Sequence, residues 1–166
     1  MNPSDVFRKR NLTKTNWDYE DLIGRNFSNC NMSKANLKDR DIHNADLSGA
    51  DLTQANLSCT ILFFVKCRGS DLRSADLSGA KIWDADLYGA NLQTADLRGA
   101  DLFYSDLRSC DLFGANMSGI NLRHANFTGA NTESVNFNNA NYDEYTMNTL
   151  SDESKDALKK QGKHWQ

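Results

Sequence analysis

A period of five residues is the feature that most constrains the fold of this chain. In residues 71–100, DLRSADLSGAKIWDADLYGANLQTADLRGA, a small residue, then Asp or Asn, then Leu or Ile return every five positions, with Lys81 as the one departure. The third of these residues, here called the central residue, keeps its phase from Leu12 to Met147 and is large and apolar except at Cys67 and Thr132. A period of five matches neither an α-helix nor a β-strand, so the sequence predicts a repeat architecture.

The low hydrophobicity of the chain fits such a repeat. Only 39% of the residues are hydrophobic, and the mean hydropathy is −0.65, which is low for a domain built on a thick core. If each pentapeptide ends in a corner, its central and small side chains point inward and the other three face water. Four such units would complete a square coil of about twenty residues.

This pattern resembles the pentapeptide-repeat family, whose motif A(D/N)LxG is present as ADLSG at residues 45–49 and 75–79. The resemblance covers about residues 11–147 and implies an all-β solenoid, a right-handed quadrilateral β-helix of about seven coils. We expect an N-terminal cap over 1–10, the β-helix over 11–148, and a C-terminal helical cap and tail over 149–166. Ser151, followed by acidic residues and later by Lys159 and Lys160, predicts a short α-helix over about 152–160.

Three positions that should hold small inward residues carry charges instead, namely Glu20, Arg25 and Arg40. A coil of twenty residues stacks Glu20 beneath Arg40, so an internal ion pair is one solution. A looser first coil, with these side chains in water, is the other. In either case we expect the N-terminal end to be less regular than the middle.

One outward column of the predicted coil is aromatic. The residues that follow the central residue on this side are, in order, Ile23, His43, Phe63, Trp83, Phe103 and Arg123. The candidate protein interface consists of Phe63, Phe64, Trp83, Phe103, Tyr104, Lys81 and Arg123, and Tyr88 and Phe113 are expected on flanking faces. An exposed apolar column favours a protein interface, most simply a homodimer. Alternatively, the stacked rings stabilise neighbouring coils within one molecule.

Charged residues of both signs surround this column. The basic residues at its edges are Lys66, Arg68, Arg73, Arg108 and Arg123, and the carboxylates near them are Asp71, Asp86, Asp106 and Asp111. This mixture is typical of a solvated wall of paired charges. A nucleic-acid groove that combines aromatic rings with arginines is the alternative, but a net charge of −3 and a pI near 5.6 argue against direct nucleic-acid binding.

We find no pattern of catalytic, cofactor-binding or metal-binding residues. The histidines, His43, His124 and His164, are scattered, and the cysteines, Cys30, Cys59, Cys67 and Cys110, lack the spacing of metal ligands. Three of the cysteines fall at inward positions, where a free thiol packs as a small apolar group. The chain has no apolar run of the roughly 20 residues that span a bilayer, so we expect no membrane association, a cytoplasmic location and reduced thiols.

The sequence therefore predicts a non-enzymatic protein interaction module or scaffold, with a protein partner or a second copy as its ligand. The family resemblance implies an alternative, because some members imitate DNA and protect a type II topoisomerase, DNA gyrase. A DNA mimic needs a dense negative field. Between Asp41 and Arg123, however, lysines and arginines offset most of the carboxylates, and the unbroken phase leaves no projecting loop.

Overall fold

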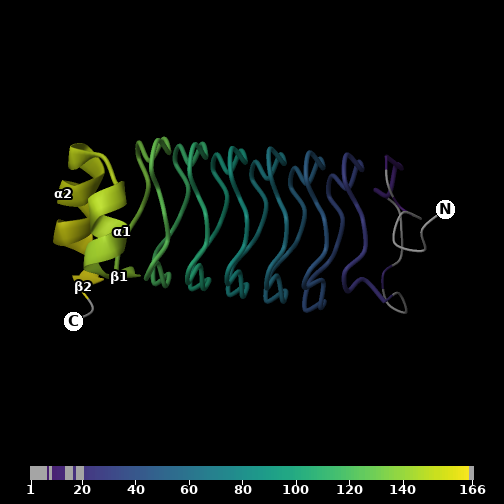
Figure 1. Ribbon diagram of the computed structural model, residues 1–166, viewed down its shortest axis with the longest axis horizontal. Coiled ribbons are helices and arrows are strands. Elements are labelled where there is room, and N and C mark those ends of the chain that lie inside the picture. The colour runs from purple at the N-terminus through teal and green to yellow at the C-terminus, as the bar shows by residue number, and fades with distance from the viewer. Residues whose placement is uncertain (1–6, 8, 14–16, 18–20, 165–166) are drawn as a thin grey trace.

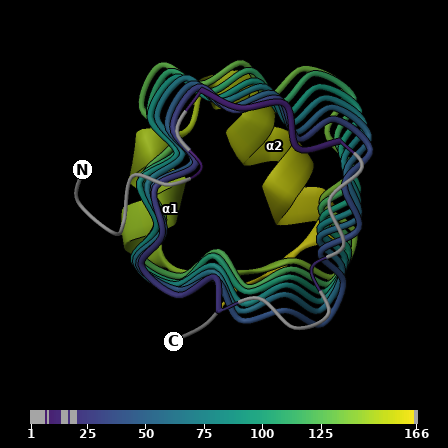
Figure 2. The same cartoon turned by 90° about the vertical axis from the view of Figure 1, so that its right-hand side faces the viewer.

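The chain forms a right-handed quadrilateral β-helix that is closed at its C-terminal end by helices (Figure 1). The computed structural model describes residues 7, 9–13, 17 and 21–164. Seen along the axis, successive coils superpose in a four-sided outline (Figure 2). The fold class implied by the family resemblance is confirmed.

Parallel pairing between coils has a constant offset of twenty residues. The bridges extend from Asn11 and Asn31 to Asn121 and Asn141, and each joins the residues that precede two central residues. Leu52, for example, donates its amide to the Asp71 carbonyl at 2.7 Å. Four pentapeptides therefore complete one coil, and each side of the rod is a parallel ladder one pentapeptide wide.

Each pentapeptide has the same corner, as residues 51–55 illustrate. The Ala55 amide donates to the Leu52 carbonyl at 3.0 Å, and Gln54 between them takes a left-handed conformation with φ of 58°. The carboxylate of Asp51 accepts from the Thr53 amide at 3.0 Å. Asp and Asn side chains commonly cap the backbone two residues later in this way. The Asp or Asn before most central residues thus stabilises the corner, which explains its regular recurrence, although the same corner also forms after Ile61, Lys66 and Lys81.

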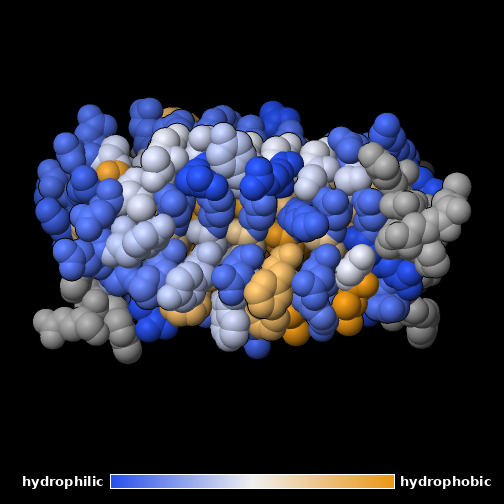
Figure 3. All heavy atoms as spheres, in the orientation of Figure 1, coloured by the Kyte–Doolittle hydropathy of each residue, from blue (hydrophilic) through white to orange (hydrophobic). Residues whose placement is uncertain are grey.

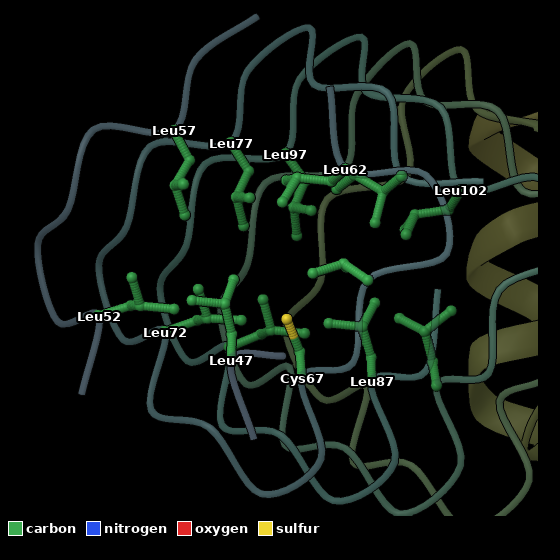
Figure 4. A pocket seen from close by; sticks show the side chains of 14 residues that line it. Leu47, Leu52, Leu57, Leu62, Cys67, Leu72, Leu77, Leu87, Leu97 and Leu102 are labelled. Carbon is green, nitrogen blue, oxygen red and sulfur yellow. The ribbon is translucent and has the colours of Figure 1, made fainter. Parts of the chain in front are cut away.

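The interior consists of columns of central and small residues, mostly Leu and Ala, that are almost fully buried. Figure 4 shows the leucines converging from successive coils, with Cys67 in a leucine position. Cys30, Cys67 and Cys110 are buried as predicted, whereas Cys59 is exposed at a corner. Burial raises the pKa of the Cys67 thiol to about 12.

The C-terminal end departs from the expected boundary at residue 148. The coil ends at β1 (Asn141–Tyr142), and a helix that we did not predict, α1 (Glu144–Thr149), follows at once. It begins there because the Asp143 side chain accepts from the Thr146 amide and caps the helix. The repeat therefore stops before Met147, although that residue keeps the phase.

The second helix agrees with the prediction from sequence. It is α2 (Asp152–Gln161), with Ser151 as the N-cap and Gly162 after its last residue. A short strand, β2 (Lys163–His164), then pairs in parallel with β1. Leu158 of α2 is fully buried, so the helix closes the end of the hydrophobic interior. Figure 2 shows α2 crossing the far opening of the coil, with α1 at one side.

Aromatic rings fill the first coil at the N-terminal end. Phe7 stacks on Phe27 with ring centroids 5.1 Å apart, and Trp17 meets Phe27 edge to face at 5.7 Å. Arg25 is partly exposed, with Nη2 lying 3.6 Å from Asp21, and Arg40 is also partly exposed. Glu20 and most of the predicted cap over 1–10 lie outside the described residues.

Candidate functional site

The aromatic column begins with a stacked pair on adjacent coils. Phe63 and Trp83 lie with ring centroids 4.7 Å apart and planes 29° from parallel. Trp83 is 41% exposed, so one face of this pair is open to solvent. Phe64, at the adjoining corner, is 55% exposed. These three side chains form an apolar patch in the middle of the rod.

A second group of rings follows one coil later. Phe103 meets Tyr104 edge to face at 4.5 Å, and Tyr104 stacks on His124 at 4.5 Å. The Arg123 guanidinium lies 5.3 Å from the centre of the Phe103 ring, which is a cation–π distance. Tyr145 of α1 extends the group, with its ring 6.0 Å from His124.

The column is therefore two groups rather than one continuous ladder. Among the described residues, no ring contact joins Trp83 to Phe103, and Asp84 occupies the corner between Phe64 and Tyr104. We call the surface made by both groups the aromatic face. It consists of Phe63, Phe64, Trp83, Phe103, Tyr104 and His124, with Lys81 and Arg123 at its edges.

The corner residues of this face share the backbone conformation of the other corners but carry larger side chains than most of them. Phe64, Tyr104 and His124 have φ of 55°, 59° and 59°, in the left-handed region that glycine occupies at equivalent corners such as Gly49 and Gly79. A side chain with a Cβ costs about 1–2 kcal/mol there. Asn44, Gln54 and Ser109 bear the same cost at corners on this and other sides, so the strain belongs to the repeat. The size and exposure of the side chains, rather than the backbone, direct attention to this face.

The two aromatic residues expected on flanking faces, Tyr88 and Phe113, lie on different sides of the rod. Tyr88 is on the next side of the rod, with the guanidinium carbons of Arg68 and Arg108 at 5.4 and 5.6 Å from its ring centre. Phe113 follows Phe103 by half a coil, so it lies on the opposite side. The expectation that Phe113 lies on a flanking face is wrong, because four pentapeptides make one coil and ten residues are half of it.

The basic residues on the side next to the face are paired, since Arg108 contacts Asp106 at 2.7 Å and Arg68 contacts Asp86. Arg73, which contacts Asp71 at 2.6 Å, lies with Asp111 and Phe113 on the opposite side, so the expectation that these charges edge the face is wrong. Hydrogen bonds from these arginines hold the pKa of both Asp71 and Asp106 below its ordinary value. The walls beside the face are thus a solvated mixture of ion pairs. Figure 3 shows one side of the rod, where a small group of apolar side chains lies among hydrophilic ones.

The described residues offer little for chemistry or for an internal ligand. His43 and His124 lie beside Asp41 and Asp143, at 2.7 and 3.4 Å, and neither pair adjoins a nucleophile. Within the described ranges, no three His, Cys, Asp or Glu side chains are grouped to hold a metal ion. The space between the leucine columns is only about 10 Å³, near the lower limit for one water molecule. In the same part of the chain, none of the helices has the length and apolarity needed to cross a membrane.

Sequence reasoning missed His124 of the aromatic face and Tyr145, whose ring lies beside it. His124 continues the corner column of Phe64 and Tyr104 at twenty-residue spacing, so the repeat already contained the signal for it. Tyr145 could not be placed in this way, because α1 takes it out of the repeat.

Comparison with known proteins agrees with the geometry. Eight copies of the family model "Pentapeptide repeats" match overlapping stretches that together extend from residue 11 to residue 141. No match was found among curated protein sequences. A trypsin-treated variant of QnrB1, a plasmid-mediated fluoroquinolone resistance protein, is similar over 94% of this chain and 87% of that chain, with 19% identity and a TM-score of 0.62. A pentapeptide repeat protein from Nostoc PCC 7120 shares 35% identity over 72% of this chain and 84% of that chain, with a TM-score of 0.41.

Proposed function

Because the chain belongs to the pentapeptide-repeat family, we propose that it is a non-enzymatic interaction module that pairs with a second copy of itself through the aromatic face. The rod supplies a rigid frame, since every coil is hydrogen-bonded to the next. Function then depends on the outward side chains, which the repeat leaves free to vary. The aromatic face is the surface on which large apolar side chains gather.

The observation that carries this proposal is the exposure of Phe64, a large apolar side chain at a corner. Its left-handed backbone, which the other corners share, costs about 1–2 kcal/mol, its side chain is 55% exposed, and none of the described aromatic rings packs against it. In the isolated molecule, the free-energy cost of this backbone conformation nearly cancels the gain from partial burial of the side chain. Phe at this corner therefore adds little to the stability of the rod. Burial against another molecule would supply the missing stabilisation, since aromatic side chains dominate interface energetics.

A second copy is favoured by the order of residues along the face. Consider a two-fold axis that lies in the plane of the interface and is perpendicular to the rod. It makes the two rods antiparallel and sets each column of one copy against the same column of the other. Centred between the two ring groups, this arrangement places Trp83 opposite Phe103 and Lys81 opposite Asp101. Opposite charges then meet at the edge of an aromatic contact, which favours this pairing over a parallel one.

The oligomeric state of a double variant tests the proposal. Trp83→Asp combined with Phe103→Asp should give a folded monomer by light scattering and circular dichroism, because each change places a carboxylate in the apolar contact. Phe113→Asp is the matched control, since Phe113 follows a central residue and is 42% exposed, like Trp83, but lies on the opposite side. An unchanged mass for the double variant would contradict the proposal.

Gyrase protection by DNA mimicry is less well supported. The similarity to QnrB1 concerns the fold, because only 19% of the residues are identical. Asp71, Asp96 and Asp106 each form an ion pair with the arginine two residues later, which cancels much of the negative field that DNA mimicry requires. The purified protein should accordingly leave DNA supercoiling by gyrase unchanged at micromolar concentration. Dose-dependent protection of gyrase would instead favour DNA mimicry over self-association.

A further inference from the structure

The C-terminal cap satisfies the backbone of the last coil unevenly. On one side, the Phe127 amide donates to Thr149 Oγ1 at 3.0 Å. On another, the Phe137 amide donates to Gln161 Oε1 at 3.1 Å, and the Asn139 amide donates to the Gln161 carbonyl at 2.6 Å. A third side ends in β1, which pairs with β2. These three sides of the coil therefore have partners from the cap.

The fourth side, at residues 130–135, faces a hollow of about 440 Å³ between the last coil and α2. Among the described residues, nothing accepts a hydrogen bond from the amides of Thr132 and Ser134, and nothing donates one to the Ala130 carbonyl. One hydrogen bond, between the hydroxyls of Thr132 and Ser154, crosses to the helix. We call this stretch the open edge.

The coil below shows what these groups are arranged to bind. There, the Leu112 amide donates to the Asn131 carbonyl at 2.8 Å, and the Gly114 amide donates to the Glu133 carbonyl at 3.0 Å. The Asn131 amide in turn donates to the Cys110 carbonyl at 2.9 Å. Twenty residues later, the open edge presents the same two donors and one acceptor. An added parallel strand could form the same three hydrogen bonds.

The side chains around the open edge indicate the chemistry of such a strand. Glu133 and Glu153 line the hollow and are exposed, and neither forms an ion pair with another described residue. The remaining wall includes the small apolar side chains of Ala130, Val135 and Ala157. We propose that the open edge binds an extended basic segment of another protein, with small side chains toward the hollow and Lys or Arg beside the two carboxylates.

Titration of the isotope-labelled protein with acetyl-KASAK-amide tests this proposal by NMR. The Thr132 and Ser134 amide signals should shift saturably, because each amide gains an acceptor. Methylating the backbone nitrogen of the peptide serine removes the donor for the Ala130 carbonyl, so it should weaken binding about tenfold. This comparison leaves the protein itself unchanged.

Charge is tested separately. Glu133→Gln combined with Glu153→Gln should weaken binding about fivefold, while Glu144→Gln, an exposed glutamate on α1, should leave the affinity unchanged. The proposal is overturned if the two amides do not shift, or if neither backbone methylation nor loss of the carboxylates changes the affinity. It is also overturned if the same amides shift when the protein is concentrated without peptide, since a second copy would then occupy the edge.

Discussion

Replacing Phe64 by glycine should separate folding from association. Full burial of a Phe side chain contributes about 1.5–3 kcal/mol, and Phe64 is a little under half buried, so the change loses about 1 kcal/mol. Relief of the left-handed backbone at φ of 55° returns about 1–2 kcal/mol, and the greater freedom of glycine in the unfolded chain costs about 0.5–1 kcal/mol. The free energy of unfolding of the monomer should therefore change by less than about 1 kcal/mol.

Association should respond differently, because truncating a central interface aromatic commonly costs more than about 1 kcal/mol. We expect the dimer dissociation constant, measured by sedimentation equilibrium, to rise tenfold or more. Stability is measured by urea unfolding of diluted, monomeric protein. Gln54→Gly is the control, since Gln54 has the same left-handed conformation on another side and should leave the dissociation constant unchanged. A loss of 3 kcal/mol in unfolding free energy, or an unchanged dissociation constant, would refute the reasoning.

Three further predictions concern charges and thiols. Lys81→Asp should weaken the dimer by setting like charges opposite one another, and adding Asp101→Lys should restore it in the same sedimentation assay. A hydrogen bond from the arginine two residues later keeps the pKa of Asp106 below its unfolded value. Its stabilising contribution is therefore complete above about pH 4 and is lost as the pH falls through the folded value, so Asp106→Asn should make the acid decline in urea-unfolding free energy shallower. Iodoacetamide at pH 8 should label the exposed thiol of Cys59 but not that of Cys67, which is buried and has a pKa of about 12. Labelling the folded protein and then analysing its peptides by mass spectrometry checks this.

The central part of the fold follows from the sequence because one local rule is repeated. The central and small residues between residues 11 and 141 state which side chains point inward, and Ser151 marks the start of α2. The missed helix α1 shows where this reasoning is weak. Met147 keeps the phase, but Thr146 replaces the Asp or Asn that stabilises most corners, and Asp143 caps a helix instead. Capping chemistry, rather than hydrophobic phase, ended the repeat.

The sequence predicted which outward column carries the candidate site, but it did not predict which side chains of that column touch one another. Twenty-residue spacing places Phe63 and Trp83 on neighbouring coils, and they do stack. The break between Trp83 and Phe103 depends on side-chain orientations, which the spacing does not determine. The open edge was also beyond sequence reasoning, because it depends on the path that the cap takes after residue 142.

The corner hydrogen bond separates the charge of the rod from its shape. Asp71 accepts from the Arg73 amide at 3.2 Å, and Asn91 accepts from the Gln93 amide at 3.1 Å at the equivalent place one coil later. An acid and an amide thus perform the same structural task. Exchanging one for the other along a side would redraw the electrostatic potential while every coil stays in register. A protein of this kind can acquire a new class of partner through single-residue changes, with no cost to its architecture.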